Sequence, residues 1–141
     1  MQSNKRDGLP KPQFKSDRID EALHRLHLAV EGIKASVVVN RDGLLVAAYP
    51  PGDNDSIISP TSIPQVAAMS ATLAGLAERT LDRLEQGELE RLMMEGEEGI
   101  MVVYPAGRAM LAVLVDKKAQ MSRVLVGSRK AAQDIAVVLD S

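Results

Sequence analysis

The sequence predicts an α+β fold in which helices flank a five-stranded antiparallel sheet. Three observations predict it. A helix-periodic segment beginning near Asp17 runs directly into a β-rich hairpin, a long helical segment follows, and short turns connect three further strand-like segments within residues 88–115. Strands joined by short turns pair antiparallel. The order α-β-β-α-β-β-β-α therefore describes an α+β sheet rather than a doubly wound parallel one.

The first helix is predicted from Asp17 to about Glu31. Its apolar residues recur at helical spacing on one face: Ile19, Leu23, Leu26, Val30 and Ile33. His24 and His27 lie on the opposite, polar side. Two histidines do not complete a metal site, and the chain has no other His and no Cys, so both are expected to be solvated.

A hairpin follows this helix. Two β-rich runs, 36–39 and 44–48, flank Asn40-Arg41-Asp42-Gly43, whose residues tolerate the positive φ angles of tight hairpin turns. The Val-rich run 36–39 and the later run 109–115 are apolar on both faces. Both are therefore expected to be interior strands with helices on each side.

Two segments read as irregular by composition. Residues 1–15 contain Lys5, Arg6, Lys11 and Lys15 with almost no apolar side chains, and are predicted to be a disordered basic tail before a single domain at 16–141. The Pro-rich and polar stretch 50–62 is predicted to be a loop.

The second helix is predicted from Ile63 to about Gln86, because Ser62 and Gln65 form a capping-box pattern and Gly87 follows. Its sheet-facing stripe is expected to comprise Val66, Ser70, Leu73, Ala77, Thr80 and Leu84. The opposite face of its N-terminal half carries only small residues, which let another backbone come close: Ala68, Ala71, Thr72 and Gly75. Alanine also favours helix, which is a simpler explanation, but glycine within a helix costs about 1 kcal/mol relative to alanine and suggests a packing reason.

The C-terminal half of the same helix is charged. Arg79 and Arg83 stand four residues apart on one face, with Asp82 between them. They are candidates for contacts to carboxylates or phosphates of a partner. The alternative is that they form exposed ion pairs along the helix with Glu78 or Asp82, which contribute little to stability.

Three strands and a last helix complete the chain, with strands expected at 88–95, 100–104 and 109–115 and the helix at about 119–139. Charged residues mark 88–95 as an edge strand, which also bears Leu92, Met93 and Met94. A two-fold axis beside this strand would pair it with its own copy and bring two small-residue helix faces together. An isologous dimer is therefore predicted.

Composition excludes several functional classes. The chain has 141 residues, a net charge of −2, no cysteine and only three aromatic residues. Disulfides, thiolate zinc sites and a cysteine nucleophile are excluded, and nothing favours binding to nucleic acid. No apolar run approaches the length of a membrane span, so a cytoplasmic protein without membrane insertion is expected. No nucleophile elbow or phosphate-binding loop occurs, so neither catalysis nor a cofactor is predicted.

Three segments together resemble the Roadblock/LC7 family. Gly-Ile-x-Ala-Ser-Val-Val-Val-Asn-Arg-Asp-Gly-Leu-Leu-Val-Ala from Gly32 resembles that family's first hairpin. Ala-Ala-Met-Ser-Ala-Thr-Leu from Ala67 is similar to the start of its long central helix, and Leu-Val-Asp from Leu114, followed by a terminal helix, to its last strand and helix. The resemblance extends over about residues 17–139 and is closest to the short, prokaryotic, single-domain members.

The resemblance implies a long helix on one face of the sheet, the first and last helices on the other, and a homodimer built through the central helix and the third strand. Family members include dynein light chains, subunits of GTPase-docking scaffolds and bacterial partners of small Ras-like GTPases. The resemblance therefore implies a non-catalytic regulator or scaffold that binds such a GTPase and stimulates its hydrolysis or localises it. Two alternatives remain open at this point: a structural adaptor for a motor, receptor or other non-GTPase complex, and a small-molecule sensor.

Overall fold

The structure, a computed structural model, describes residues 14–50 and 62–141, and the expected basic tail up to residue 13 and the expected loop at 51–61 lie outside this range. The order of elements is the predicted one. The elements are α1 (Lys15–Ala29), β2 (Ile33–Asn40), β3 (Leu45–Tyr49), α2 (Ile63–Arg83), β4 (Leu92–Glu95), β5 (Gly99–Ala106), β6 (Ala109–Asp116) and α3 (Met121–Asp140).

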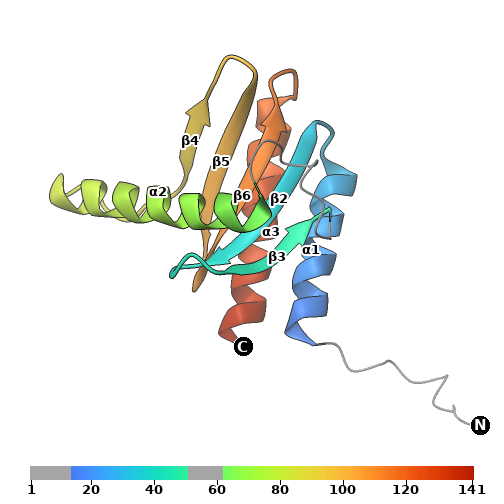
Figure 1. The fold of residues 1–141 in the computed structure, drawn as a ribbon, viewed down its shortest axis with the longest axis horizontal. Coiled ribbons are helices and arrows are strands. Elements are labelled where there is room, and N and C mark those ends of the chain that lie inside the picture. The colour runs from blue at the N-terminus through green and yellow to red at the C-terminus, as the bar shows by residue number, and fades with distance from the viewer. Residues whose placement is uncertain (1–13, 51–61) are drawn as a thin grey trace, which may run out of the picture.

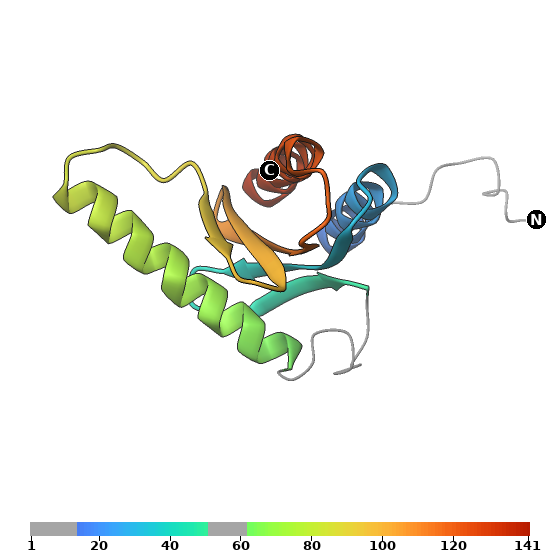
Figure 2. The ribbon, with the colours of Figure 1, turned by 90° about the horizontal axis from the view of Figure 1, so that it is seen from above.

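All five strands form one antiparallel sheet in the order β3-β2-β6-β5-β4. Helix α2 crosses one face, and α1 and α3 lie side by side on the other (Figures 1 and 2). The layering that the family resemblance implied is confirmed. The two apolar runs are interior strands, β2 and β6, and β4 lies at the edge, also as predicted.

The face under α1 and α3 holds the larger buried cluster. Leu23 of α1, Leu111 of β6 and Ile135 of α3 have no measurable exposure or close to none. The two helices approach closely at Gly127, where an added Cβ would lie 2.6 Å from a methyl carbon of Val30. Glycine is therefore required by packing at this position.

The hairpin turn between β2 and β3 forms through local hydrogen bonds. The Asn40 side-chain oxygen accepts the backbone N–H groups of Asp42 and Leu44 at 2.9 and 3.0 Å, and Gly43 has a φ of +91°. Asparagine and glycine suit these positions because one supplies the acceptor and the other adopts positive φ without steric cost.

The predicted sheet-facing stripe of α2 is only partly correct. Ile63, Val66, Ala67, Ser70 and Ala74 are the buried residues of this helix, whereas Thr80 is exposed and the Leu84 side chain is 62% exposed. The reason is the path of the helix. Its N-terminal half crosses the sheet, and its C-terminal half projects past the edge strand β4 (Figures 1 and 2). A periodic stripe is buried only where there is a sheet beneath it.

Three boundaries also differ from expectation. The capping box at Ser62 and Gln65 forms as predicted, but α2 ends at Arg83 rather than near Gln86, and Glu85 takes a positive φ of 56°. Strand β4 begins at Leu92, so the charged residues at 88–91 precede the strand instead of belonging to it. Helix α1 spans 15–29, two residues earlier than expected at both ends.

The expectation of solvated histidines is wrong for His27. Its ring is half-buried, its Nε2 lies 2.9 Å from the buried Ser36 hydroxyl oxygen, and its centroid lies 4.5 Å from that of Tyr49. Burial, with a smaller contribution from His24, lowers the pKa of His27 to about 4. His24 is exposed but lies 2.9 Å from the Tyr49 hydroxyl. The polar side of α1 therefore packs against β3. The sequence pattern of α1 did not indicate this contact.

Candidate functional site

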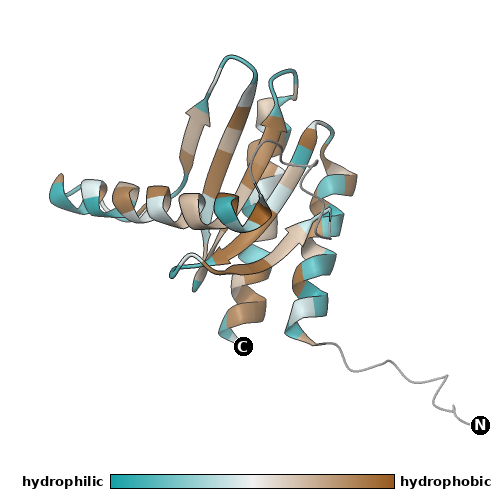
Figure 3. Cartoon of the chain, viewed as in Figure 1, coloured by the Kyte–Doolittle hydropathy of each residue, from teal (hydrophilic) through white to brown (hydrophobic). Residues whose placement is uncertain are grey.

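On the α2 face of the sheet, most strand residues are buried, and Leu92, Met101 and Leu114 are half-buried. Beside the N-terminal half of α2 lies an apolar hollow of about 110 Å³ between the helix and strands β2, β5 and β6, lined among others by Val66, Met69, Met101 and Leu114. Figure 3 shows hydrophobic stretches on these strands in the part of the sheet that α2 does not cross. Met101 and Leu114 are only half-buried there, so a small apolar surface remains accessible next to the helix.

Helix α2 carries two exposed large apolar side chains, of which Met69 lines this hollow. Met69 is 50% exposed and Leu76 is 54% exposed, and the seven-residue spacing puts both on one side of the helix. Sequence reasoning missed both residues, because the periodicity was assigned to a stripe centred on Leu73. The signal that identifies them is the pair of large apolar residues at i and i+7 outside that stripe.

The small residues predicted to form one face of α2 are exposed or half-buried. Ala68 and Thr72 are exposed, and Ala71 and Gly75 are half-buried. At one end of this face the hairpin turn comes close, since a Cβ added at Gly43 would lie 3.6 Å from the Ala68 Cα. The other end lies near the β4 edge, where α2 leaves the sheet (Figure 2).

Gly75 has no evident packing reason within the subunit. Among the described residues, a Cβ added there would meet only the Arg79 guanidinium of the same helix, at 3.6 Å, an ordinary van der Waals distance. Because glycine costs stability within a helix, a reason outside the subunit is the remaining physical explanation for this residue.

The three predicted charged residues are exposed on the projecting half of α2. Arg79, Asp82 and Arg83 make no ion pair within 4.0 Å to any residue in the described part of the chain. The alternative of pairing with Glu78 is not what the structure shows, because Glu78 binds Arg41 of the hairpin turn, whose Nη1 donates to both carboxylate oxygens at 2.9 Å. The two arginines on α2 are therefore available to a partner.

Strand β4 presents a free edge. Leu92 and Met94 are half-buried on the α2 side, and Met93 is 50% exposed. The strand pairs with β5 on one side and with no described strand on the other. The predicted interface residues on α2 and β4 thus lie around one corner of the molecule, where the helix passes over the edge strand.

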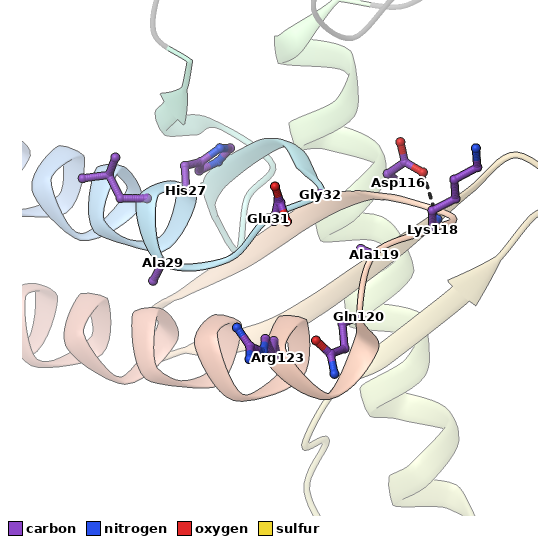
Figure 4. A pocket seen from close by; sticks show the side chains of 10 residues that line it. His27, Ala29, Glu31, Gly32, Asp116, Lys118, Ala119, Gln120 and Arg123 are labelled. Atoms are coloured by element: carbon purple, nitrogen blue, oxygen red, sulfur yellow. Dashed lines mark hydrogen bonds between the residues drawn. The ribbon is translucent and has the colours of Figure 1, made fainter.

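A larger hollow, with a volume of about 630 Å³, lies at the end of the molecule where α1 meets the β6–α3 turn (Figure 4). Its polar side chains are spread over separate elements, with His27 on α1 and Arg123 on α3, and do not point to a common centre. The one hydrogen bond drawn there joins the Lys118 backbone N–H to the Asp116 carboxylate at 2.8 Å. This arrangement matches no catalytic constellation.

No group of three or more His, Asp or Glu side chains within residues 14–50 and 62–141 is placed to hold a metal ion. No helix in these same ranges has the length and apolarity needed to cross a lipid bilayer.

Comparisons with known proteins agree with this geometry. Residues 19–115 match the profile of the Roadblock/LC7 domain. The uncharacterized protein MJ1340 of Methanocaldococcus jannaschii is 38% identical over 117 residues, which cover 83% of this chain and 96% of that protein. Among solved structures, the gliding protein MglB of Thermus thermophilus superimposes with a TM-score of 0.77 at 18% identity, covering 94% of this chain and 96% of MglB.

A second MglB structure, with a tetrameric arrangement, gives the same TM-score and identity and covers 94% of this chain and 95% of its own. These structural likenesses establish the fold. The sequence match, which spans more than half of the chain, establishes the family. The chain belongs to the Roadblock/LC7 family, whose members are regulatory and adaptor proteins.

Proposed function

We propose that this protein is a homodimeric, non-catalytic regulator or scaffold that binds a small Ras-like GTPase in the cytoplasm. Family membership supports a regulatory or adaptor role. The observation that carries the dimer is the projection of α2 beyond the sheet edge, on the face of the sheet that also holds the apolar hollow.

A two-fold axis perpendicular to the sheet beside β4 satisfies both features. It pairs the free edge of β4 with its copy, which removes an exposed strand edge. It also places both α2 helices on the same face of the joined sheet. Each projecting helix then reaches the apolar hollow beside α2 of the other subunit. It covers the exposed apolar side chains of Met69 and Leu76 there.

The small-residue positions and the edge residues share this proposed interface: Ala68, Ala71, Thr72, Gly75, Leu92, Met93 and Met94. Small side chains let the two α2 helices come close, and Gly75 acquires the packing reason that the single subunit lacks. Substitution of Gly75 by arginine is therefore expected to give a folded monomer by light scattering. The matched control is Val126→Arg, which changes an exposed position of α3 and leaves the dimer mass unchanged. A Gly75→Arg variant that still has the dimer mass would place the interface elsewhere.

The GTPase-facing residues in this proposal are Arg79, Asp82 and Arg83. In the dimer, the two projecting helix halves bring both copies of this cluster close to the two-fold axis. Guanidinium groups without intramolecular partners are suited to bidentate contacts with carboxylates or phosphates. The proposed mechanism is that the paired helices position the switch segments of the GTPase, with activation or localisation as the outcome.

The experiment is affinity capture from native lysate with a non-hydrolysable GTP analogue or GDP present, with captured proteins identified by mass spectrometry. A small GTPase bound in one nucleotide state, and lost with the Arg79→Ala/Arg83→Ala variant that remains dimeric, supports the proposal. Failure to recover any GTPase contradicts it. Capture of a non-GTPase protein regardless of nucleotide identifies the chain as a structural adaptor instead.

A further inference from the structure

A third hollow, with a polar lining, lies on the α3 side of the sheet beside the start of β4. It has a volume of about 250 Å³ between the segment before β4, the end of β5 and the middle of α3, and its charged lining residues are Glu90, Arg91 and Arg129. Neither arginine makes an ion pair within 4.0 Å to the described residues. The Tyr104 hydroxyl there donates to the Leu125 carbonyl at 3.1 Å. Two guanidinium groups thus face one carboxylate, and a further carboxylate would balance the charge.

The backbone of β4 determines what its free edge offers. The Gly96 N–H donates to the Gly99 carbonyl at 2.9 Å, so the even-numbered residues of β4 direct their backbone groups toward β5. Because hydrogen bonding alternates along an antiparallel strand, the backbone groups of Met93 and Glu95 point outward. Their side chains lie on the face opposite Leu92, which packs in the α2-side core. Arg91 is two residues before Met93 and lines the hollow on that same face.

Pairing of β4 with its copy is restricted to a few registers. Directly opposite residues of an antiparallel pair point to the same face of the sheet. The two-fold axis must therefore pass opposite one residue, with Leu92, Met93 or Met94 facing itself. A shift by one residue would place α2-side residues opposite α3-side residues, which the symmetry does not allow.

The side chains discriminate among these three registers. With Met93 facing itself, Arg91 stands opposite Glu95 of the second copy on both sides of the axis, and Leu92 stands opposite Met94. With Leu92 at the axis, Arg91 stands opposite Met93 and gains no carboxylate. With Met94 at the axis, Arg91 stands opposite Glu97, which lies in the turn after β4 rather than in the strand, and Met93 stands opposite Glu95, an apolar side chain against a charge. Opposite charges across a strand pair are favourable, so the first register is preferred.

We propose that Glu95 of a second copy completes the hollow at Arg91 and Arg129, in the register that places Met93 opposite itself. This inference rests on the dimer of the proposed function and specifies its register. Glu95 is suited to the role. Lys117 of its own subunit donates to it at 2.9 Å and lowers the pKa of its carboxyl, so the group is charged when it meets Arg91. The two subunits are then linked by two symmetric chains of Lys117, Glu95 and Arg91.

The absence of native cysteine allows a direct test of the register. Opposite residues in a hydrogen-bonded pair have Cα atoms about 5.5 Å apart, within the range of about 4.4–6.8 Å that a disulfide spans, whereas a displacement by two residues exceeds it. Single-cysteine variants Leu92→Cys, Met93→Cys and Met94→Cys are first shown to be dimers under reducing conditions and are then oxidised. Met93→Cys is expected to form the covalent dimer at least about tenfold faster than the other two.

The outcomes separate the two proposals. If the three variants and the wild-type chain were all monomeric before oxidation, this result would contradict the dimer itself. A dimer in which Leu92→Cys or Met94→Cys cross-links fastest would retain the dimer and overturn the register.

Charge reversal tests the ion pair. Arg91→Glu and Glu95→Arg each place like charges opposite one another in their own homodimers, and each is expected to weaken dimerisation about tenfold or more. An equimolar mixture of the two variants restores both opposite-charge pairs, and its mixed dimer is expected to regain nearly wild-type affinity. Glu98→Arg is the matched control and leaves the dimer affinity unchanged. A mixture that dimerises no better than either variant alone would overturn the ion pair.

Discussion

The two faces of the sheet differ in how completely they are covered. On the α1/α3 face, nineteen of the described residues form the buried cluster, and α1 and α3 approach closely enough to require Gly127. On the α2 face, the buried cluster holds eleven of the described residues, and no buried residue of α2 lies beyond Ala74. On the first face, the described chain buries the hydrophobic core on its own. On the second face, apolar residues at the margin of the core, such as Leu92, Met101 and Leu114, are only partly buried.

This difference separates stability from association. Because hydrophobic stabilisation follows buried apolar area, the α1/α3 face supplies the larger share of the subunit's stability. The exposed apolar residues beside α2 add little until another chain covers them. The free energy of unfolding of the subunit and the affinity of the dimer should therefore respond to substitutions on different faces.

The largest effect on the subunit is expected from Leu23→Ala on the α1/α3 face, called the closed face below, in contrast to the α2 face, called the open face. The side chain is fully buried, and its truncation leaves a cavity, so the free energy of unfolding should fall by about 3 kcal/mol. Urea denaturation in a monomeric Gly75→Arg background measures this without a contribution from dimerisation. The control is Leu76→Ala on the open face, with an expected change below about 0.5 kcal/mol. Equal losses for the two variants would contradict the comparison.

The next effect concerns association. Leu76→Glu places a charge on the open face and is expected to raise the dissociation constant of the dimer about 100-fold, with the helical content unchanged. Sedimentation equilibrium provides the measurement. Val137→Glu serves as the control, because Val137 is similarly exposed, at 64% against 54%, but lies on α3. If Val137→Glu were the variant that dissociates, the interface would belong to the other face.

The third effect is on pH dependence and belongs to the closed face. Burial lowers the pKa of His27 to about 4, below the value of about 6.5 expected in the unfolded chain. The unfolded state then binds a proton between pH 6.5 and 4 that the folded state does not. Stability from this group is full above pH 6.5 and declines toward pH 4, by about 1–2 kcal/mol since the ring is partly solvated. His27→Gln should flatten this part of the stability profile. Superimposable wild-type and variant profiles would show that the ring is solvated after all.

The smallest effect is expected where α2 is tied to the hairpin turn. Arg41→Ala removes the ion pair with Glu78, whose partly exposed side chains limit the loss to about 0.5 kcal/mol. A double-mutant cycle with Glu78→Ala, followed by urea denaturation, isolates the pair. A coupling energy above about 2 kcal/mol would mean that this contact, rather than the apolar residues beneath it, holds α2 on the sheet.

Local signals in the sequence predicted much of the fold for identifiable reasons. The hairpin turn was predictable because Asn40 and Gly43 act on neighbouring backbone groups, and the start of α2 because Ser62 and Gln65 cap each other. The errors have a different origin. Leu84 follows the helical period of the buried stripe but extends past the sheet, and His27 has a polar side chain that β3 happens to cover.

The candidate site divides in the same way. The sequence alone determined the order of elements, the edge position of the strand expected at 88–95, the small residues of α2 and the family, because these depend on residue types at close spacing. Only the tertiary structure decided that α2 leaves the sheet at β4, that Met69 and Leu76 are exposed with Met69 lining an apolar hollow, and that Arg91 and Arg129 share a hollow. Those features depend on the angle at which a helix crosses a sheet and on contacts between residues far apart in the chain, which no local spacing encodes.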